Sequence, residues 1–162
     1  MRPQVLIVMG SDSDMPVMEE TGKILNKLGI SYEMVIASAH RTPERVIRLA
    51  SEAEGKGVDV IIAGAGMAAH LAGVLASHTI VPVIGVPIDL PPLNGLDALF
   101  STVQMPPGVP VATMAIGRAG AKNAAILSAQ IIGRKDSEVA KRLKDYRTKM
   151  AEEIELKYPL TR

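Results

Sequence analysis

The most constraining feature of this sequence is a regular alternation of short apolar runs with segments of helical periodicity. Val5–Met9 is a continuous apolar run, the pattern of a parallel strand that is covered on both faces. Apolar residues at helical spacing follow it and stop at Gly29, a typical residue for a helix end. The succession repeats, with strands expected at 5–9, 32–37, 58–63, 81–86 and 110–116. Such an alternation predicts an α/β fold built on a parallel sheet.

Helices are expected between these strands. Thr42 as N-cap, Pro43 at the first helical position and Glu44 in the first turn predict one helix start. Further helices are expected to end near 77 and to cover 96–103 and 121–132. The chain has 162 residues and shows no internal repeat or linker, so one domain over 1–162 is expected.

The last segment, about 137–158, is predicted to be a long amphipathic helix. Its apolar stripe recurs at steps of three and four residues among charged positions: Val139, Leu143, Tyr146, Met150 and Ile154. At ~1.5 Å per residue, such a helix spans about 30 Å. Two interpretations stay open, an ordinary cover helix on its own domain and a helix that packs on a neighbouring subunit.

The middle of the chain is unusually poor in charge. No Lys or Arg occurs between Lys56 and Arg118, and the only acidic residues there are Asp59, Asp89 and Asp97. A small domain cannot hide so long a segment in one core, so part of it is expected to be buried against other subunits. The alternative is an exposed surface rich in Ala, Gly, Ser and Pro.

Composition argues against several classes of function. A net charge of +1 gives no long-range attraction to nucleic acid, and 2% aromatic residues leave little on which bases can stack. No apolar stretch suits a membrane span, and no secretory signal is expected. The absence of cysteine fits a cytoplasmic enzyme. The three histidines lack the spacing of metal ligands, so no metal is expected.

Three successive strand ends deliver polar or glycine-rich segments: Gly10–Asp14, Ser38–Thr42 and Gly64–His70. In an open parallel sheet, ligands bind beyond the carboxyl ends of the strands. The three segments are therefore expected to form one site.

The first segment lies between a strand and a helix start, where free backbone N–H groups and the helix dipole favour a phosphate. Ser11 and Ser13 add hydroxyl donors. Asp14 would repel a phosphate, so it is expected to accept hydrogen bonds from ribose hydroxyls or to cap the helix, as Ser13 also can. The alternative is that these residues only build a turn.

The second segment places His40 beside Arg41 at the sheet edge. An imidazole gains and loses a proton close to neutral pH, and a guanidinium binds phosphate in a bidentate fork. The pair suits proton transfer on a phosphorylated small molecule. The alternatives are a core or capping histidine and a structural ion pair.

The third segment contains a competing signal. Residues 64–69 read Gly-Ala-Gly-Met-Ala-Ala and fit the G-x-G-x-x-A dinucleotide pattern, with Asp89 about twenty residues further on. However, Pro87 disturbs the approach to Asp89, and small residues also serve close helix packing. His70 is expected to face the ligand or a subunit contact, and His78 to lie on the surface.

Four motifs together resemble the PurE family of purine biosynthesis. They are Gly10-Ser11-x-Ser13-Asp14, Ser38-Ala39-His40-Arg41-Thr42-Pro43, Gly64-Ala65-Gly66-x-Ala68-Ala69-His70-Leu71 and Gln104-Met105-Pro106-x-Gly108-x-Pro110-Val111. The chain is more similar to class I, the N5-carboxyaminoimidazole ribonucleotide mutases, than to class II. Class II enzymes carboxylate aminoimidazole ribonucleotide with CO2 and usually carry Lys where Arg41 stands. The chain departs from class I at Ala72, where Pro is common, and in residues 89–92.

The resemblance implies a flavodoxin-like three-layer α/β/α sandwich, assembled as a homo-octamer with sites at subunit contacts. It also implies roles for the site residues. The expected ribonucleotide-binding residues are Ser11, Ser13, Asp14, Ser38, Arg41, Gly64, Ala65, Gly66 and His70, and His40 is the expected general acid/base.

The implied mechanism needs no cofactor. The carboxylate leaves the exocyclic nitrogen of N5-carboxyaminoimidazole ribonucleotide while His40 supplies a proton. Ring carbon C4 attacks the caged CO2, and His40 then removes the C4 proton. A positioned base of this kind is often worth ~100- to 10,000-fold in rate. The alternatives are a CO2-dependent aminoimidazole ribonucleotide carboxylase and a dinucleotide- or flavin-binding module.

Overall fold

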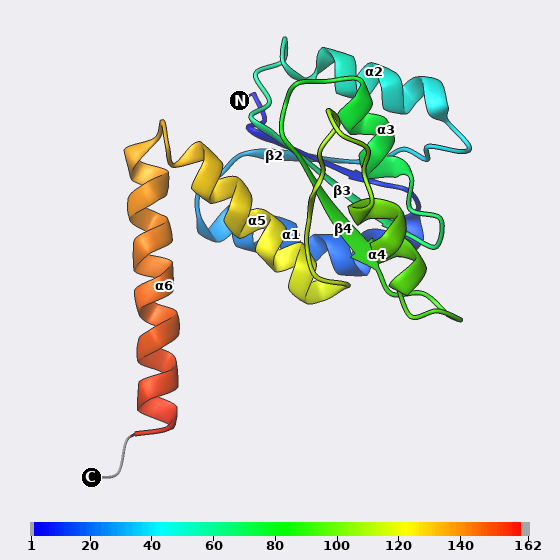
Figure 1. Cartoon of the computed structure of the whole chain (residues 1–162). Coiled ribbons are helices and arrows are strands. Elements are labelled where there is room, and N and C mark those ends of the chain that lie inside the picture. Colours follow the sequence, from blue (N-terminus) through cyan, green and yellow to red (C-terminus); the bar gives the residue numbers. More distant parts are fainter. Residues whose placement is uncertain (1, 160–162) are drawn as a thin grey trace.

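The computed structural model describes residues 2–159, which form one parallel sheet with helices on both faces (Figure 1). The strands are β1 (Val5–Met9), β2 (Tyr32–Ile36), β3 (Val60–Gly66), β4 (Val83–Ile88) and β5 (Ala112–Thr113). They lie in the order β2-β1-β3-β4-β5, and every neighbouring pair is parallel. This order is flavodoxin-like, with the strand order reversing between β1 and β3. The predicted fold class is confirmed.

The helices form the two outer layers. On one face, α1 (Met15–Lys27) and α5 (Arg118–Ile132) pack against each other and on the sheet. On the other face lie α2 (Pro43–Ala53), α3 (Leu71–Ser77) and α4 (Leu96–Val103). Helix α4 agrees with the predicted 96–103, and Pro43 is the first residue of α2 as expected.

Strand β1 shows why the central strands are apolar throughout. Val5, Ile7 and Met9 join the core below α1 and α5, whereas Leu6 and Val8 join the core on the other face. All five side chains are buried. A strand covered on both faces has no solvent side, so a polar residue at any of its positions would lose hydration.

The third strand is longer than predicted and corrects one expectation. The predicted strand ended at residue 63, but β3 runs on through Gly64, Ala65 and Gly66 and pairs them with β4. Their small size serves close approach, because a Cβ atom at Gly64 would overlap the side chain of Met18, and one at Gly66 that of Leu90.

The fifth strand is shorter than the predicted 110–116. Pro110 has no N–H to donate, and β5 pairs with β4 only at Ile84 and Gly85. Beyond these pairs, single hydrogen bonds continue the contact with β4: the N–H of Met114 donates to the Gly85 carbonyl, and the N–H of Gly117 donates to the Pro87 carbonyl, both at 2.8 Å. Pro87 itself lies inside β4, where it accepts a hydrogen bond but has no N–H to donate.

Helix α6 (Ser137–Lys157) packs on its own domain only at its start. Val139 and Leu143 are buried against the core, and Arg142 Nε donates to Leu28 O at 2.6 Å. The rest of the helix leads away from the sheet (Figure 1). Met150 and Ile154, the last two residues of the predicted stripe, are 48% and 62% exposed.

The weakly charged middle segment presents apolar side chains on the surface. Leu96, Phe100 and Val103 follow helical spacing on α4, and they are 52%, 60% and 47% exposed. Ile80, just before β4, is also exposed. Patches of this kind mark contact surfaces in proteins.

Residues 2–159 contain neither a membrane-spanning helix nor a cluster of metal ligands. None of the helices there combines the length and apolar character that a bilayer crossing demands. Within the same residues, no three His, Cys, Asp or Glu side chains gather in a way that could hold a metal ion.

Candidate active site

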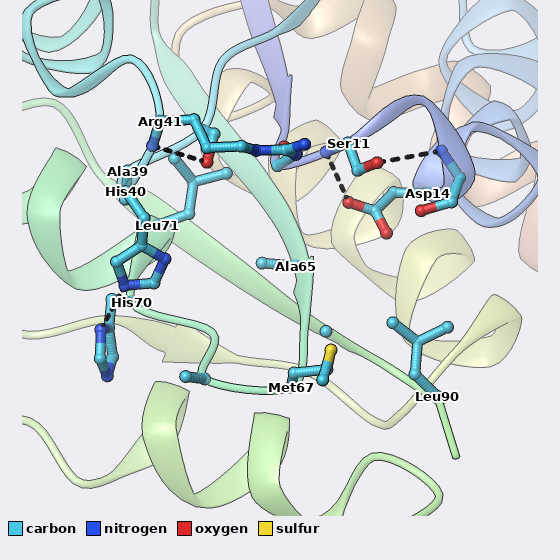
Figure 2. A pocket seen from close by; sticks show the side chains of 15 residues that line it. Ser11, Asp14, Ala39, His40, Arg41, Ala65, Met67, His70, Leu71 and Leu90 are labelled. Carbon is cyan, nitrogen blue, oxygen red and sulfur yellow. Dashed lines mark hydrogen bonds between the residues drawn. The ribbon is translucent and has the colours of Figure 1, made fainter. Parts of the chain in front are cut away.

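A cavity of about 480 Å³ lies beyond the carboxyl ends of β1, β2 and β3. These strands are neighbours in the sheet, so the three polar segments that follow them meet there, as predicted (Figure 2). The lining residues are Gly10, Ser11, Ser13, Asp14, Ser38, Ala39, His40, Arg41, Ala65, Gly66, Met67, Ala68, His70, Leu71 and Leu90. We call Ser11, Ser13, Asp14, Ser38 and Arg41 the polar wall, and Ala65, Gly66, Met67, Ala68 and Leu90 the apolar wall.

The first turn is a capping box. Ser11 is the N-cap of a 3-10 helix, η1 (Asp12–Asp14), and its hydroxyl accepts from the N–H of Ser13 at 3.4 Å. Asp14 Oδ2 accepts from the N–H of Ser11 at 2.9 Å. Asp14 stands at the N-cap position of α1, one of the two roles expected for it, but its side chain makes no cap hydrogen bond to that helix. Ser11 does the capping, one turn earlier.

Burial distinguishes Asp14 from the rest of the polar wall. Its side chain lines the cavity yet is only 3% exposed. Desolvation by this burial raises the pKa of its carboxyl, although backbone hydrogen bonds from Ser11 and Gly10 and the Arg41 charge oppose the change. For Asp12, by contrast, the hydrogen bond from the Ser11 hydroxyl lowers the carboxyl pKa.

Local hydrogen bonds shape the second segment. Thr42 Oγ1 accepts from the N–H of Ser38 at 2.9 Å and donates to the Ser38 carbonyl at 3.1 Å. The Ser38 hydroxyl accepts from the N–H of Arg41 at 3.2 Å. Thr42 therefore stands at the predicted N-cap position of α2, but its side chain closes the preceding turn instead of capping the helix. This closed turn presents His40 at its tip.

Arg41 joins the first two segments. Its Nη2 donates to the carbonyl of Gly10 at 2.9 Å, across 31 positions of sequence. A guanidinium has five N–H donors, and in residues 2–159 this is the one side-chain hydrogen bond that Arg41 makes. The cation is thereby fixed beside the serine-rich turn, with donors available for an anion. The cavity wall thus has the charge that a phosphate requires.

The two histidines of the cavity contact each other. His40 Nε2 lies 2.9 Å from His70 Nδ1, and the ring planes meet at 69° with their centroids 4.9 Å apart. This bond needs a proton on one of the facing nitrogens and none on the other. If both rings were charged, both nitrogens would carry protons and the bond would be lost. The bond between the two rings is therefore compatible with one charged ring but not with two.

The third segment supplies His70 and the backbone of the apolar wall. Of the predicted glycines, Gly66 lines the cavity, while Gly64 lies behind it and its carbonyl accepts from the N–H of Gly10 at 3.1 Å. Because these glycines belong to a strand, the tight turn of a dinucleotide fingerprint is not formed here. Asp89 is near Gly117 at the start of α5 rather than in the cavity wall, and His78 is exposed at the end of α3.

Sequence reasoning missed two large residues of the wall, Met67 and Leu90. Leu90 was named only as part of the departure at residues 89–92, and its packing over Gly66 follows only from the three-dimensional path of the chain after β4. Met67 carried a weak signal, because it is a lone bulky residue in a run of Gly and Ala at a strand end. Its φ of 55° is left-handed, a conformation that costs a non-glycine residue roughly 1–2 kcal/mol.

Comparison with known proteins relates most of the chain to one family. The family model described as AIR carboxylase matches residues 4–153. The N5-carboxyaminoimidazole ribonucleotide mutase of Thermotoga maritima is 57% identical over 152 residues, which cover 94% of this chain and 88% of that protein. The mutase of Escherichia coli (strain K12) is 49% identical over 151 residues, 93% of this chain and 89% of that protein.

Solved structures agree with the sequence comparison. The crystal structure of Treponema denticola PurE matches with a TM-score of 0.85 and 33% sequence identity. The match covers 98% of this chain and 99% of that chain. The similarity thus extends over the complete fold, including the strand ends that form the cavity.

Proposed function

Because the chain belongs to the AIR carboxylase family, we propose that its cavity binds N5-carboxyaminoimidazole ribonucleotide and that His40 moves the protons of the reaction. The protein is a mutase of purine biosynthesis, an isomerase that shifts a carboxyl group within its substrate. The observation that carries the residue assignment is the position of His40, at the cavity between a cation-bearing polar wall and an apolar wall.

The polar wall suits the ribose phosphate. Arg41 and the hydroxyls of Ser11, Ser13 and Ser38 line the cavity beside the start of η1, and together they offer a cation and hydroxyl donors to an anion. Asp14 accepts hydrogen bonds from the ribose hydroxyls, since a carboxylate is an acceptor and does not favour the phosphate itself. Anchoring the ribose phosphate here leaves the heterocycle to extend along the cavity toward the histidines.

His40 acts as both acid and base. The C–N bond to the exocyclic nitrogen breaks, its electron pair stays on that nitrogen, and His40 donates a proton there. Ring carbon C4 then attacks the released CO2, and His40 takes the C4 proton as the ring regains aromaticity. The proton count closes without a cofactor, because the same imidazole gives one proton and recovers another.

His70 positions His40 in this scheme. The bond between His40 Nε2 and His70 Nδ1 fixes the orientation of the His40 ring and breaks if both rings are charged. His70 also lines the cavity, which supports the predicted contact with the ligand. Its conservative replacement by Asn is expected to alter the pH profile of turnover more than substrate affinity.

The reaction itself is tested without any energy source. N5-carboxyaminoimidazole ribonucleotide, supplied without ATP or bicarbonate, is expected to give 4-carboxy-5-aminoimidazole ribonucleotide. A parallel reaction starts from aminoimidazole ribonucleotide and bicarbonate. Faster product formation in the parallel reaction would contradict the mutase and favour the direct carboxylase.

Assembly and location complete the proposal. A homo-oligomer, the octamer of the PurE resemblance, is supported by the exposed apolar side chains of α4 and of the far half of α6. Light scattering at micromolar protein concentration is expected to show this oligomer, and a monomer would contradict it. A cytoplasmic location is supported by a chain without cysteine.

A further inference from the structure

Met67 combines properties that the local fold does not explain. Its backbone is left-handed with φ of 55°, although glycine and asparagine suit that conformation far better. Its side chain is 56% exposed, so packing gives little in return. It nevertheless lines the cavity. A strained residue that neither backbone preference nor burial favours is a reason to look for a functional role.

The backbone around Met67 leaves its position little freedom. The N–H of Ala69 donates to the Met67 carbonyl at 2.9 Å, and the N–H of His70 donates to the Ala68 carbonyl at 2.8 Å. These are two successive three-residue turns, squeezed between the end of β3 and the start of α3. Met67 is therefore fixed only three residues from the histidine that contacts His40.

The surroundings of Met67 in the cavity are apolar. Leu90 lines the same wall and packs over Gly66, and Ala65 lies between them and the polar wall. Figure 2 shows Met67 and Leu90 on one side of the cavity and Ser11 and Arg41 on the other. A methionine suits a cover over an irregular space, because its unbranched thioether adapts its shape.

The reaction creates a need for such a cover. Once the C–N bond breaks, CO2 is a free, uncharged molecule until C4 attacks it. Charged donors of the polar wall hold it poorly, so its retention depends on a wall that leaves no water path. Escape of CO2 would leave aminoimidazole ribonucleotide behind and end the cycle without product.

We propose that Met67, together with Leu90, covers the apolar end of the cavity and retains CO2 between its release and its capture by C4. The inference rests on the proposed mutase reaction. In this role Met67 determines how much of the released CO2 enters the product and how much escapes to solvent, whereas His40 carries out the proton transfers.

The test measures where the carboxyl carbon of the product comes from. N5-carboxyaminoimidazole ribonucleotide of natural isotopic composition is converted in buffer that contains carbon-13 bicarbonate and carbonic anhydrase, and mass spectrometry gives the labelled fraction of the product. Met67→Ala removes the side chain and keeps the left-handed strain, whereas Met67→Gly removes both. Met150→Ala, on exposed α6 outside the cavity, is the matched control.

Both Met67 variants are expected to raise the labelled fraction several-fold and to release free aminoimidazole ribonucleotide, while Met150→Ala matches the wild type. An unchanged labelled fraction in both variants overturns the inference, as does a rise confined to Met67→Gly, which would trace the effect to the backbone. Weaker ribonucleotide binding at an unchanged labelled fraction also overturns it. If the wild-type protein forms no product from the carbamate, the proposed function fails instead, so the two failures are distinguishable.

Discussion

Hydrogen bonds hold the polar wall of the cavity, whereas close packing of small residues forms the apolar wall. In the polar wall, short hydrogen bonds hold each turn: Ser11 donates to Asp14 in the first, and Ser38 donates to Thr42 in the second. Arg41 joins the two turns through its hydrogen bond to the Gly10 carbonyl. In the apolar wall, Gly66 of β3 leaves room for Leu90, and Met67 adds a side chain on a strained backbone; behind the wall, Gly64 leaves room for Met18. The polar wall thus depends on which side chains can form hydrogen bonds, whereas the apolar wall depends on how closely neighbouring side chains can pack.

The largest effect is expected where the two walls meet, at His40. Replacing His40 by Asn keeps the size of the side chain but removes the acid/base, so turnover should fall by about 100- to 10,000-fold. Ribonucleotide affinity, measured by calorimetry, should stay near the wild-type value because the polar wall is intact. His70→Asn serves as the comparison and should lose less activity. Retention of a tenth or more of the wild-type rate by His40→Asn would remove His40 from the mechanism.

Arg41→Ala breaks the polar wall itself. A hydrogen bond to a charged group contributes about 1.5–3 kcal/mol, so ribonucleotide affinity should fall roughly 10- to 100-fold. Arg48→Ala removes the same charge from an exposed position on α2 and should leave affinity unchanged. Calorimetric titration of both variants decides the point. Equal affinities for wild type and Arg41→Ala would exclude this guanidinium from phosphate binding.

Gly64→Ala challenges the close packing behind the apolar wall. The added Cβ would overlap the buried side chain of Met18, so the free energy of unfolding should fall by about 1–3 kcal/mol. Gly55→Ala adds the same methyl group where only ordinary contact awaits it, and its stability should stay close to wild type. Urea unfolding of both variants measures the difference. Equal stabilities would mean that β3 and α1 separate more easily than the packing suggests.

The same contrast explains what could be predicted from the sequence. Apolar runs and helix signals identified the strands and the order of elements, and strand ends with Ser, Asp, His and Arg identified the polar wall, because such residues carry their chemistry locally. The cap at Ser11 was missed, since Ser11, Ser13 and Asp14 are all good cap residues and only backbone geometry selects among them. Leu90 was missed because its neighbour Gly66 is distant in sequence.

The third strand shows the limit most clearly. Gly64 and Gly66 predict a turn when residues are considered one by one, because glycine is most common where the backbone bends. In the fold they lie in β3, since side chains from α1 and from the segment after β4 occupy the space that their Cβ atoms would take. Packing across the sheet decides whether a glycine forms a turn or leaves room for a neighbouring side chain. That packing cannot be read directly from a single sequence.

The smallest expected effect concerns the one buried carboxyl group of the polar wall, Asp14. Burial raises its pKa above the ordinary value of 3.8, so the folded state holds the proton more tightly than the unfolded chain does. The free energy of unfolding is therefore greatest when Asp14 is protonated. It declines as pH rises from the ordinary pKa of 3.8 through the raised pKa of the folded state. Asp14→Asn removes this decline, while its amide oxygen can still accept from the N–H of Ser11.

Asp14→Asn and the wild type should thus have similar free energies of unfolding near pH 3, and the variant should be the more stable of the two at neutral pH. Ribonucleotide affinity should fall at the same time, because the ribose loses its acceptor. Urea unfolding at several pH values tests the first statement and calorimetry the second. A variant less stable than wild type at neutral pH would show that the hydrogen bonds to Asp14 outweigh its desolvation. In that case Asp14 would stabilise the folded protein, instead of lowering its stability in return for ribonucleotide binding.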